Sequence, residues 1–306
     1  VAETALGDVR GTEGFYHYRQ YSAPELAATR TFEDVWQLAF DGELPRTVAD
    51  RSAFAAEVAS LRALPAELLE LLPLVARSGT PMEGLRTGLS QLAAIEGLPP
   101  SLGLDHETLR TEAMRLSAAT PTIAAALHRL RHGLDPIAPD PALGHAASYL
   151  HMVTGEAPPA GHACALEQYL ILALDHGFNA STFTSRVVTS TGADLGAALV
   201  AASGSLSGPL HGGAIDRSLE TLDAIGSPAR AWEWVRDAIE HGRTIMGFGH
   251  PVYRTADPRA QILRTVAEAL GGSRIDLAIE VEAAVEEALE ELKPGRELHT
   301  NIEWYA

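Results

Sequence analysis

The sequence predicts an all-α protein built from two helical domains. Hydrophobic residues make up 46% of its 306 residues and aromatic residues only 6%, and much of the apolar content is alanine and leucine, which suit closely packed helices. Signals for helix starts and stops recur along almost the whole chain, and no regular alternation of strands with helices indicates a doubly wound sheet. Because this length exceeds the size at which a single core usually stops growing, we expect two domains.

Capping residues, prolines and glycines mark the expected helices in order. Ser22 to Glu25 reads as a capping box, Thr31 opens the next helix, and Pro65 separates two helices farther along. Pro121 is expected to break or kink the longest helical segment, because proline lacks the N–H of a regular helix. We expect helices over residues 31–41, 47–63, 66–77, 81–97, 104–132, 141–154, 160–176, 181–191, 194–207, 213–225, 228–242, 258–270 and 275–292.

The composition argues against several classes of partner and site. A net charge of −17 would repel a nucleic-acid backbone, so we expect no nucleic-acid partner. Cys164 is the only cysteine, which excludes an internal disulfide and a four-cysteine metal site. His128 and His132 have the spacing of helical zinc ligands but no accompanying carboxylate, so we expect no metal. The chain lacks an apolar run of about 18 residues and a leader pattern, so we expect a cytoplasmic protein without a membrane span.

Two histidines in glycine-rich turns are the strongest functional signal. His211 lies within Gly208–Ala214, and His250 lies within Met246–Arg254. Glycine lets the backbone approach a ligand closely, and a helix start offers unpaired N–H groups and a partial positive charge. The pair therefore indicates a ligand site rather than packing, and the turn at residues 208–213 is the best candidate for a hinge.

A third motif, Asp175–Thr182, precedes the two histidine turns. By itself it is weak, because Asn179 and the residues after it can simply cap the next helix. In this order, however, the three motifs resemble those of the citrate synthase family. The similarity extends over nearly the whole length, from the region around Phe15–Arg19 to Asn301–Glu303.

The resemblance implies a mostly α-helical homodimer. Its large domain would cover residues 1–210 and its small domain residues 211–306, and the two would close over the substrate. The expected reaction is the condensation of acetyl-CoA with oxaloacetate to give citrate and CoA, with no permanently bound cofactor and no metal.

The resemblance also implies a role for each motif residue. His211 would hold the thioester carbonyl, where negative charge develops and a fixed donor is needed. His250 would hydrogen-bond the oxaloacetate carbonyl, and Glu303 would be the general base. His176, Arg259 and Asn179 would bind oxaloacetate, whereas Arg254 and the loop of Ile245, Met246, Gly247, Phe248 and Gly249 would face CoA.

The sequence departs from the family pattern in two places. Glu303 stands where the family usually has aspartate, and a misplacement of about 1 Å can cost about a hundredfold in rate. We expect an adapted, active base; the alternatives are a changed acyl-CoA preference or a slow or inactive enzyme. The chain also stops at Ala306, without the helices and two further arginines that the resemblance implies, so we expect a fragment or a chain with an unordered tail.

Two other functions remain open from the sequence. One is 2-methylcitrate synthesis from propionyl-CoA, because a single methylene in an apolar pocket discriminates by only about 1–3 kcal/mol. The other is a weakly active homologue that binds CoA or a dicarboxylate and has a regulatory role.

Overall fold

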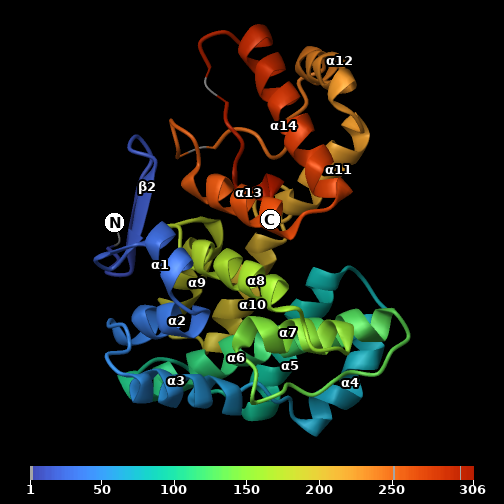
Figure 1. The fold of residues 1–306 in the computed structure, drawn as a ribbon. Helices are drawn as coiled ribbons and strands as arrows, with labels where there is room; N and C mark the ends of the chain where they lie inside the picture. The colour runs from blue at the N-terminus through green and yellow to red at the C-terminus, as the bar shows by residue number, and fades with distance from the viewer. Residues whose placement is uncertain (1–2, 251, 297) are drawn as a thin grey trace. The chain divides into compact units, whose positions relative to one another are not determined.

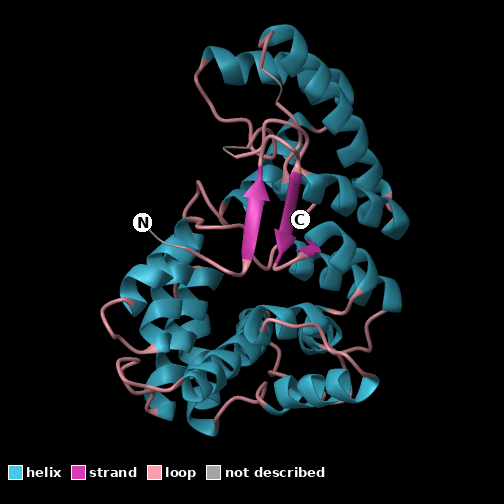
Figure 2. Cartoon of the chain, turned by 90° about the vertical axis from the view of Figure 1, so that its left-hand side faces the viewer, coloured by secondary structure: helices cyan, strands magenta, loops and turns pink. Residues whose placement is uncertain are grey.

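Helices form most of the chain, which confirms the all-α prediction (Figures 1 and 2). The computed structural model describes residues 3–250, 252–296 and 298–306, so Pro251, within the predicted turn of His250, lies outside the described residues. The strands are β1 (Gly7–Arg10), β2 (Phe15–Tyr18) and β3 (Tyr21–Ser22). The helices are α1 (Ala23–Thr29), α2 (Phe32–Asp41), α3 (Val48–Ser60), α4 (Ala66–Ala76), α5 (Pro81–Glu96), α6 (His106–Arg131), α7 (His145–Thr154), α8 (Ala160–Leu172), α9 (Ala180–Thr189), α10 (Leu195–Leu206), α11 (Ala214–Ile225), α12 (Pro228–Glu240), α13 (Pro258–Leu270), α14 (Ser273–Leu292) and the short η1 (Ile302–Trp304).

The contacts within the chain divide it into two compact units. Unit 1 contains the residues up to Thr29, a short stretch Gln168–Gly177, and Gly208–Ala306. Unit 2 contains Arg30–Glu167 and Phe178–Ser207. The predicted domain boundary between residues 210 and 211, and the hinge at residues 208–213, stay predictions.

The helix ends follow the capping chemistry expected from the sequence. The side chain of Thr31 accepts a hydrogen bond from the N–H of Asp34 at the start of α2. Thr80 and Glu83 form a reciprocal capping box before α5, and Gly97 ends that helix in the left-handed region, with φ of 63°. Such caps satisfy the backbone groups that a helix leaves unpaired at its ends.

Pro121 does not break its helix; a break was one of the two outcomes expected from the sequence, and a kink there stays a prediction. Helix α6 extends from His106 to Arg131 and so continues for ten residues beyond the proline. Residues around the proline are fully buried, including Ala119 and Ile123, in the core that α6 shares with α4 and α5 in unit 2. This packing offsets the backbone hydrogen bond that proline forfeits.

A small antiparallel sheet near the N-terminus was not anticipated. Strands β1 and β2 pair with Gly7 opposite Tyr18 and Arg10 opposite Phe15, and β3 adds to the free edge of β2. Tyr16 and Tyr18 are buried, and their hydroxyls donate to backbone carbonyls at the end of α8. The sheet is thereby fixed to the segment that leads to His176.

The core of unit 1 lies between α11, α12 and α14. Val235, Val281 and Val285 are fully buried there, and Phe248 and Trp304 pack against them. These two aromatic rings, 4.9 Å apart, come from the loop before His250 and from η1. The core therefore holds in place the two segments that carry the predicted site residues His250 and Glu303.

Among the described residues, no helix is both long and apolar enough to span a bilayer.

Candidate active site

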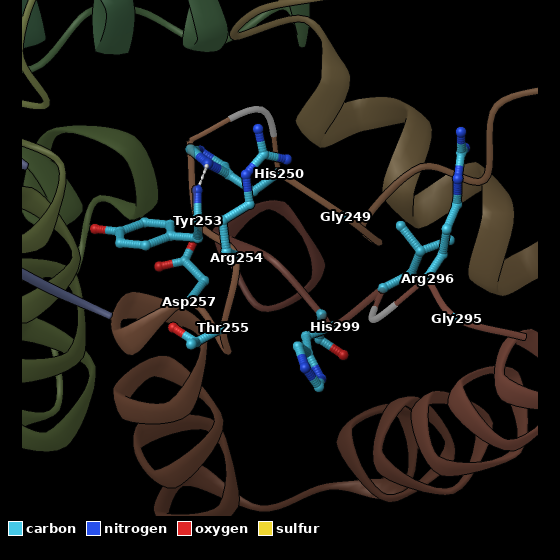
Figure 3. Close-up of a pocket in the computed structure, with 11 residues that line it drawn as sticks. Gly249, His250, Tyr253, Arg254, Thr255, Asp257, Gly295, Arg296 and His299 are labelled. Carbon is cyan, nitrogen blue, oxygen red and sulfur yellow. Dashed lines mark hydrogen bonds between the residues drawn. The ribbon is translucent and has the colours of Figure 1, made fainter. Parts of the chain in front are cut away.

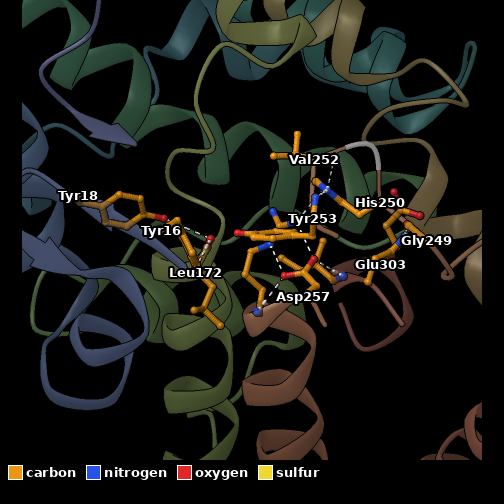
Figure 4. Close-up of polar contacts among 12 residues, drawn as sticks. Tyr16, Tyr18, Leu172, Gly249, His250, Val252, Tyr253, Asp257 and Glu303 are labelled. Atoms are coloured by element: carbon orange, nitrogen blue, oxygen red, sulfur yellow. Dashed lines mark hydrogen bonds and ion pairs between the residues drawn. The ribbon is translucent and has the colours of Figure 1, made fainter. Parts of the chain in front are cut away.

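His250 is held by the backbone that follows it. Its Nδ1 lies 3.1 Å from the amide nitrogen of Val252 and 3.2 Å from that of Tyr253 (Figure 4). Because amide N–H groups only donate, Nδ1 accepts and the neutral ring carries its proton on Nε2. Burial, with a further effect of Arg259, lowers the pKa of His250 to about 4. At neutral pH the ring is therefore uncharged, and Nε2–H is its donor.

Arg259 lies beside this donor. Its Nη2 is 3.2 Å from Nε2 of His250. A guanidinium has no acceptor, so the Nε2–H tautomer leaves two N–H donors adjacent to each other without a bond between them. A carboxylate or ketone oxygen can accept from both groups, and the arrangement is suited to an anionic or strongly polar ligand.

Asp257 fixes Arg259 and connects it to the chain around Glu303. Its carboxylate accepts from Nε of Arg259 at 3.0 Å and from Nη2 at 2.8 Å, and both side chains are more than nine-tenths buried. The second carboxylate oxygen also accepts from the N–H of Ile302 at 3.2 Å. Burial raises the pKa of Asp257, but the hydrogen bonds from Arg259 outweigh it, and the net shift is downward. The pair therefore stays ionised at neutral pH.

Further hydrogen bonds tie the Glu303 segment to the glycine loop. The N–H of Asn301 donates to the carbonyl of Gly247 at 2.9 Å, and its side-chain amide donates to that of Gly249 at 2.8 Å. The side chain of Asn301 also accepts from the N–H of Glu303 at 2.9 Å. Burial raises the pKa of the half-buried Glu303 carboxyl, which makes its ionised form a better base.

His176 joins this group through ring contacts. Its ring centroid lies 5.8 Å from that of His250 and 5.1 Å from that of Tyr16, both edge to face. Burial, with a contribution from Arg259, lowers the pKa of His176 to about 3, so the ring is neutral. Both ring nitrogens are buried, and neither has a hydrogen-bond partner within the described residues. The structure therefore brings together His176, His250 and Arg259, all within unit 1.

His211 and Asn179 are placed less directly. His211 occupies the turn before α11, and burial lowers its pKa. Its approach to the other histidines stays a prediction. The side chain of Asn179 accepts from the N–H groups of Ser181 and Thr182 and so caps α9. A substrate contact by Asn179 also stays a prediction.

The predicted CoA loop is anchored in the core. Ile245, Met246, Gly247 and Phe248 are buried, whereas Gly249 is half-buried. Gly247 has a φ of 86°, and a Cβ there would lie 2.7 Å from the ring of Trp304, so only glycine fits. The side chains of this loop therefore pack into the core and hold the loop in place. The backbone at Gly249 lines a cavity.

That cavity has a volume of about 610 Å³ and a basic lining (Figure 3). Arg254 lines it together with Arg296 and His299, and a contact of Arg254 with CoA stays a prediction. A second cavity of about 320 Å³ is lined by Arg243, Lys293 and Arg296. The segment after α14 was not predicted as part of the site, although a Pro-Gly turn between two basic residues marks it in the sequence. No group of three metal-ligating side chains is found among the described residues.

Comparison with known proteins decides the family. The family model described as citrate synthase, C-terminal domain, matches residues 1–306. The chain belongs to the citrate synthase family. This confirms the resemblance, and with it the assignment to the transferases.

Relatives with two different names match the chain. The 2-methylcitrate synthase of Mycobacterium tuberculosis is 41% identical over 90% of this chain and 68% of its own length. The citrate synthase of Haloferax volcanii is 38% identical over 100% of this chain and 81% of its own. The two identities are close, so the comparison shows the family and does not distinguish acetyl-CoA from propionyl-CoA as the acyl donor.

Solved citrate synthases have the same fold. That of Pyrobaculum aerophilum superposes with a TM-score of 0.90 at 32% identity, covering 100% of this chain and 78% of its own. That of Thermoplasma acidophilum, in a ternary complex with carboxymethyl coenzyme A and oxaloacetate, superposes with a TM-score of 0.92 at 26% identity, covering 100% and 80%.

Proposed function

We propose that the protein condenses acetyl-CoA with oxaloacetate to give citrate and CoA. The observation that carries this proposal is the pair of adjacent donors on His250 and Arg259. A 2-oxo dicarboxylate has a carboxylate for the guanidinium and a ketone oxygen for the imidazole. Asp257 connects this pair to the segment of Glu303, which would supply the base.

The chemistry assigns one task to each group. Glu303 takes a proton from the methyl group of acetyl-CoA, and His211 donates to the thioester oxygen as negative charge develops on it. The resulting enol carbon bonds to the ketone carbon of oxaloacetate. His250 polarises the ketone oxygen and supplies its proton. Water then cleaves the thioester and releases CoA and citrate.

The two basic cavities suit the phosphates of CoA. Arg254, Arg296 and Lys293 concentrate positive charge in a chain whose net charge is −17. Such a local cluster is needed to bind a polyanion against the field of the rest of the molecule. We assign the second cavity, and the part of the first that is lined by Arg254 and Arg296, to the CoA moiety, with the loop of residues 245–249 alongside, whereas the part lined by His250 is left for oxaloacetate. The homodimer that the resemblance implies stays a prediction.

A second candidate is 2-methylcitrate synthesis. The 41% identity to a protein named 2-methylcitrate synthase supports it. The same donors and base serve either acyl-CoA, because propionyl-CoA differs from acetyl-CoA only by a methyl group on the α-carbon that loses the proton and bonds to the oxo acid. The acetyl-CoA assignment remains the main one.

Steady-state release of free CoA tests the proposal. The purified protein is given oxaloacetate with acetyl-CoA or propionyl-CoA, and kcat/KM is determined for each. We expect the higher value for acetyl-CoA. A higher value for propionyl-CoA would move the assignment to 2-methylcitrate synthesis. The absence of turnover with both, in folded protein, would favour the regulatory alternative.

A further inference from the structure

Tyr253 is a buried tyrosine whose hydroxyl has no hydrogen-bond partner in the part of the chain that the structure describes. Its side chain is only 4% exposed. The other buried tyrosines of unit 1 behave differently, because Tyr16 and Tyr18 donate to the carbonyls of Leu172 and Ile171. Buried polar groups are nearly always satisfied in native proteins, so an exception requires an explanation.

The position of Tyr253 supplies that explanation. Its ring lies 4.9 Å from the ring of His250 and 5.4 Å from that of His176. The guanidinium carbon of Arg259 lies 5.7 Å from its ring centroid. The two ring nitrogens of His176 are likewise buried without hydrogen-bond partners among the residues that the structure describes. Three unsatisfied polar atoms are thus carried by rings that contact each other next to the guanidinium.

The ionisation state of Tyr253 makes it a donor. Burial raises the pKa of its phenol, although Arg259 opposes the shift. The hydroxyl therefore stays protonated at any pH at which the protein works. Figure 4 shows the hydroxyl at the end of the Tyr253 ring that lies away from the Tyr253 amide, which donates to His250. A protonated hydroxyl beside neutral His176 and cationic Arg259 is suited to an anionic acceptor.

We propose that Tyr253 is a substrate-binding residue whose hydroxyl donates a hydrogen bond to a carboxylate oxygen of the 2-oxo dicarboxylate. This inference rests on the proposed function, and it adds a specificity-determining residue to that site. The phenol would thereby favour a dicarboxylate over a monocarboxylic oxo acid, because only the former has one carboxylate for Arg259 and a second for Tyr253.

A purely structural role makes a different prediction. If a small shift let the hydroxyl bond to His176 in the free protein, its removal would lower the melting temperature and leave ligand affinity nearly unchanged. If the hydroxyl bonds the ligand, its removal weakens binding and leaves the free protein as stable as before or more so, because one unsatisfied buried group is lost.

The test compares Tyr253→Phe with Tyr18→Phe. Tyr18 is a matched control, because it is a buried tyrosine of the same unit whose hydroxyl is bonded within the fold. Calorimetric titration with oxaloacetate alone gives the Kd, thermal unfolding gives Tm, and steady-state rates give KM for each substrate. For Tyr253→Phe we expect oxaloacetate binding about 10- to 100-fold weaker, the KM for acetyl-CoA changed by less than about threefold, and no fall in Tm.

Tyr18→Phe should lower Tm, and because its hydroxyl also accepts from the N–H of Asp175 next to His176, any weakening of oxaloacetate binding should come together with that fall in Tm. Wild-type affinity for oxaloacetate in Tyr253→Phe, or a fall in its Tm like that of Tyr18→Phe, would overturn the inference while leaving the proposed function intact. Failure of the wild-type protein to bind oxaloacetate would overturn the proposed function, and this inference with it.

Discussion

The neutral tautomer of His250 is set by neighbouring groups of the chain. The amides of Val252 and Tyr253 fix the proton on Nε2, and Arg259 beside it disfavours a charged ring. Arg259 in turn has its Nε edge occupied by Asp257. Backbone amides and one buried carboxylate thus determine which atoms of the pair are left as donors.

Glu303 should govern the acid side of the pH profile. Burial raises its pKa above that of an ordinary glutamate, whereas the pKa of His250 is lowered to about 4. As pH falls, Glu303 is protonated first, and the activity that its ionised form supports is lost while His250 is still neutral. We expect kcat/KM to fall on the acid side with a single apparent pKa above the usual glutamate value.

The variant that checks this assignment is Glu303→Gln, measured from about pH 8 to pH 4.5 beside the wild type. Its rate should be lower by about 100-fold or more and should lack the acid limb. An unchanged acid limb in Glu303→Gln would assign the ionisation to another group. A higher rate in Glu303→Asp would show that the additional methylene of this glutamate is imperfectly adapted.

At the level of elements, the β1–β2 hairpin supports the segment that holds His250. The N–H of Arg254 donates to the carbonyl of Gly11 at 3.0 Å. A Cβ on Gly11 would lie 2.1 Å from the carbonyl oxygen of Val252, far inside van der Waals contact. The turn of the hairpin therefore fits against the backbone whose amides bind His250, and only glycine allows that approach.

We expect Gly11→Ala to lower kcat by about tenfold or more, because displacing Val252 disturbs the hydrogen bonds to Nδ1 of His250. The control is Gly204→Ala in α10, where the nearest atom to a new Cβ is 3.5 Å away. That change should leave kcat unaltered and keep or raise Tm, because alanine favours a helix. Both variants are compared by steady-state rates and thermal unfolding. Equal rates in the two would show that the hairpin does not support the segment of His250.

Helices were more predictable from the sequence than the hairpin. Caps such as Thr31 and stops such as Gly97 act locally, so the chain around them carries the whole signal. Strands of two to four residues alternate too briefly to be recognised, and their stability comes from Tyr16 and Tyr18 bonding to residues more than 150 positions away. The continuation of α6 through Pro121 has the same kind of cause, since long-range packing decides it.

At the scale of the whole molecule, the site collects residues from three distant stretches of the chain. The hairpin, the segment at His176 and the C-terminal part from Gly247 to Glu303 all belong to unit 1. The sequence predicted His176, His250 and Arg259 as site residues, because each lies in a short motif that resembles those of the family. The motifs did not predict that Asp257 connects Arg259 to the segment of Glu303, or that the hydroxyl of Tyr253 lacks a partner among the described residues, since both follow only from the folded arrangement.

The amount of citrate formed per CoA released, measured by mass spectrometry for wild type and His250→Ala, tests whether this site carries out the condensation. We expect equimolar citrate and CoA from acetyl-CoA and oxaloacetate in the wild type. We expect a rate about 100-fold or more lower in His250→Ala, in a protein that keeps its helical content but has a lower Tm, because the amides of Val252 and Tyr253 lose their acceptor. CoA release without citrate, or a loss of less than about tenfold in the variant, would contradict the assignment of the condensation to this site.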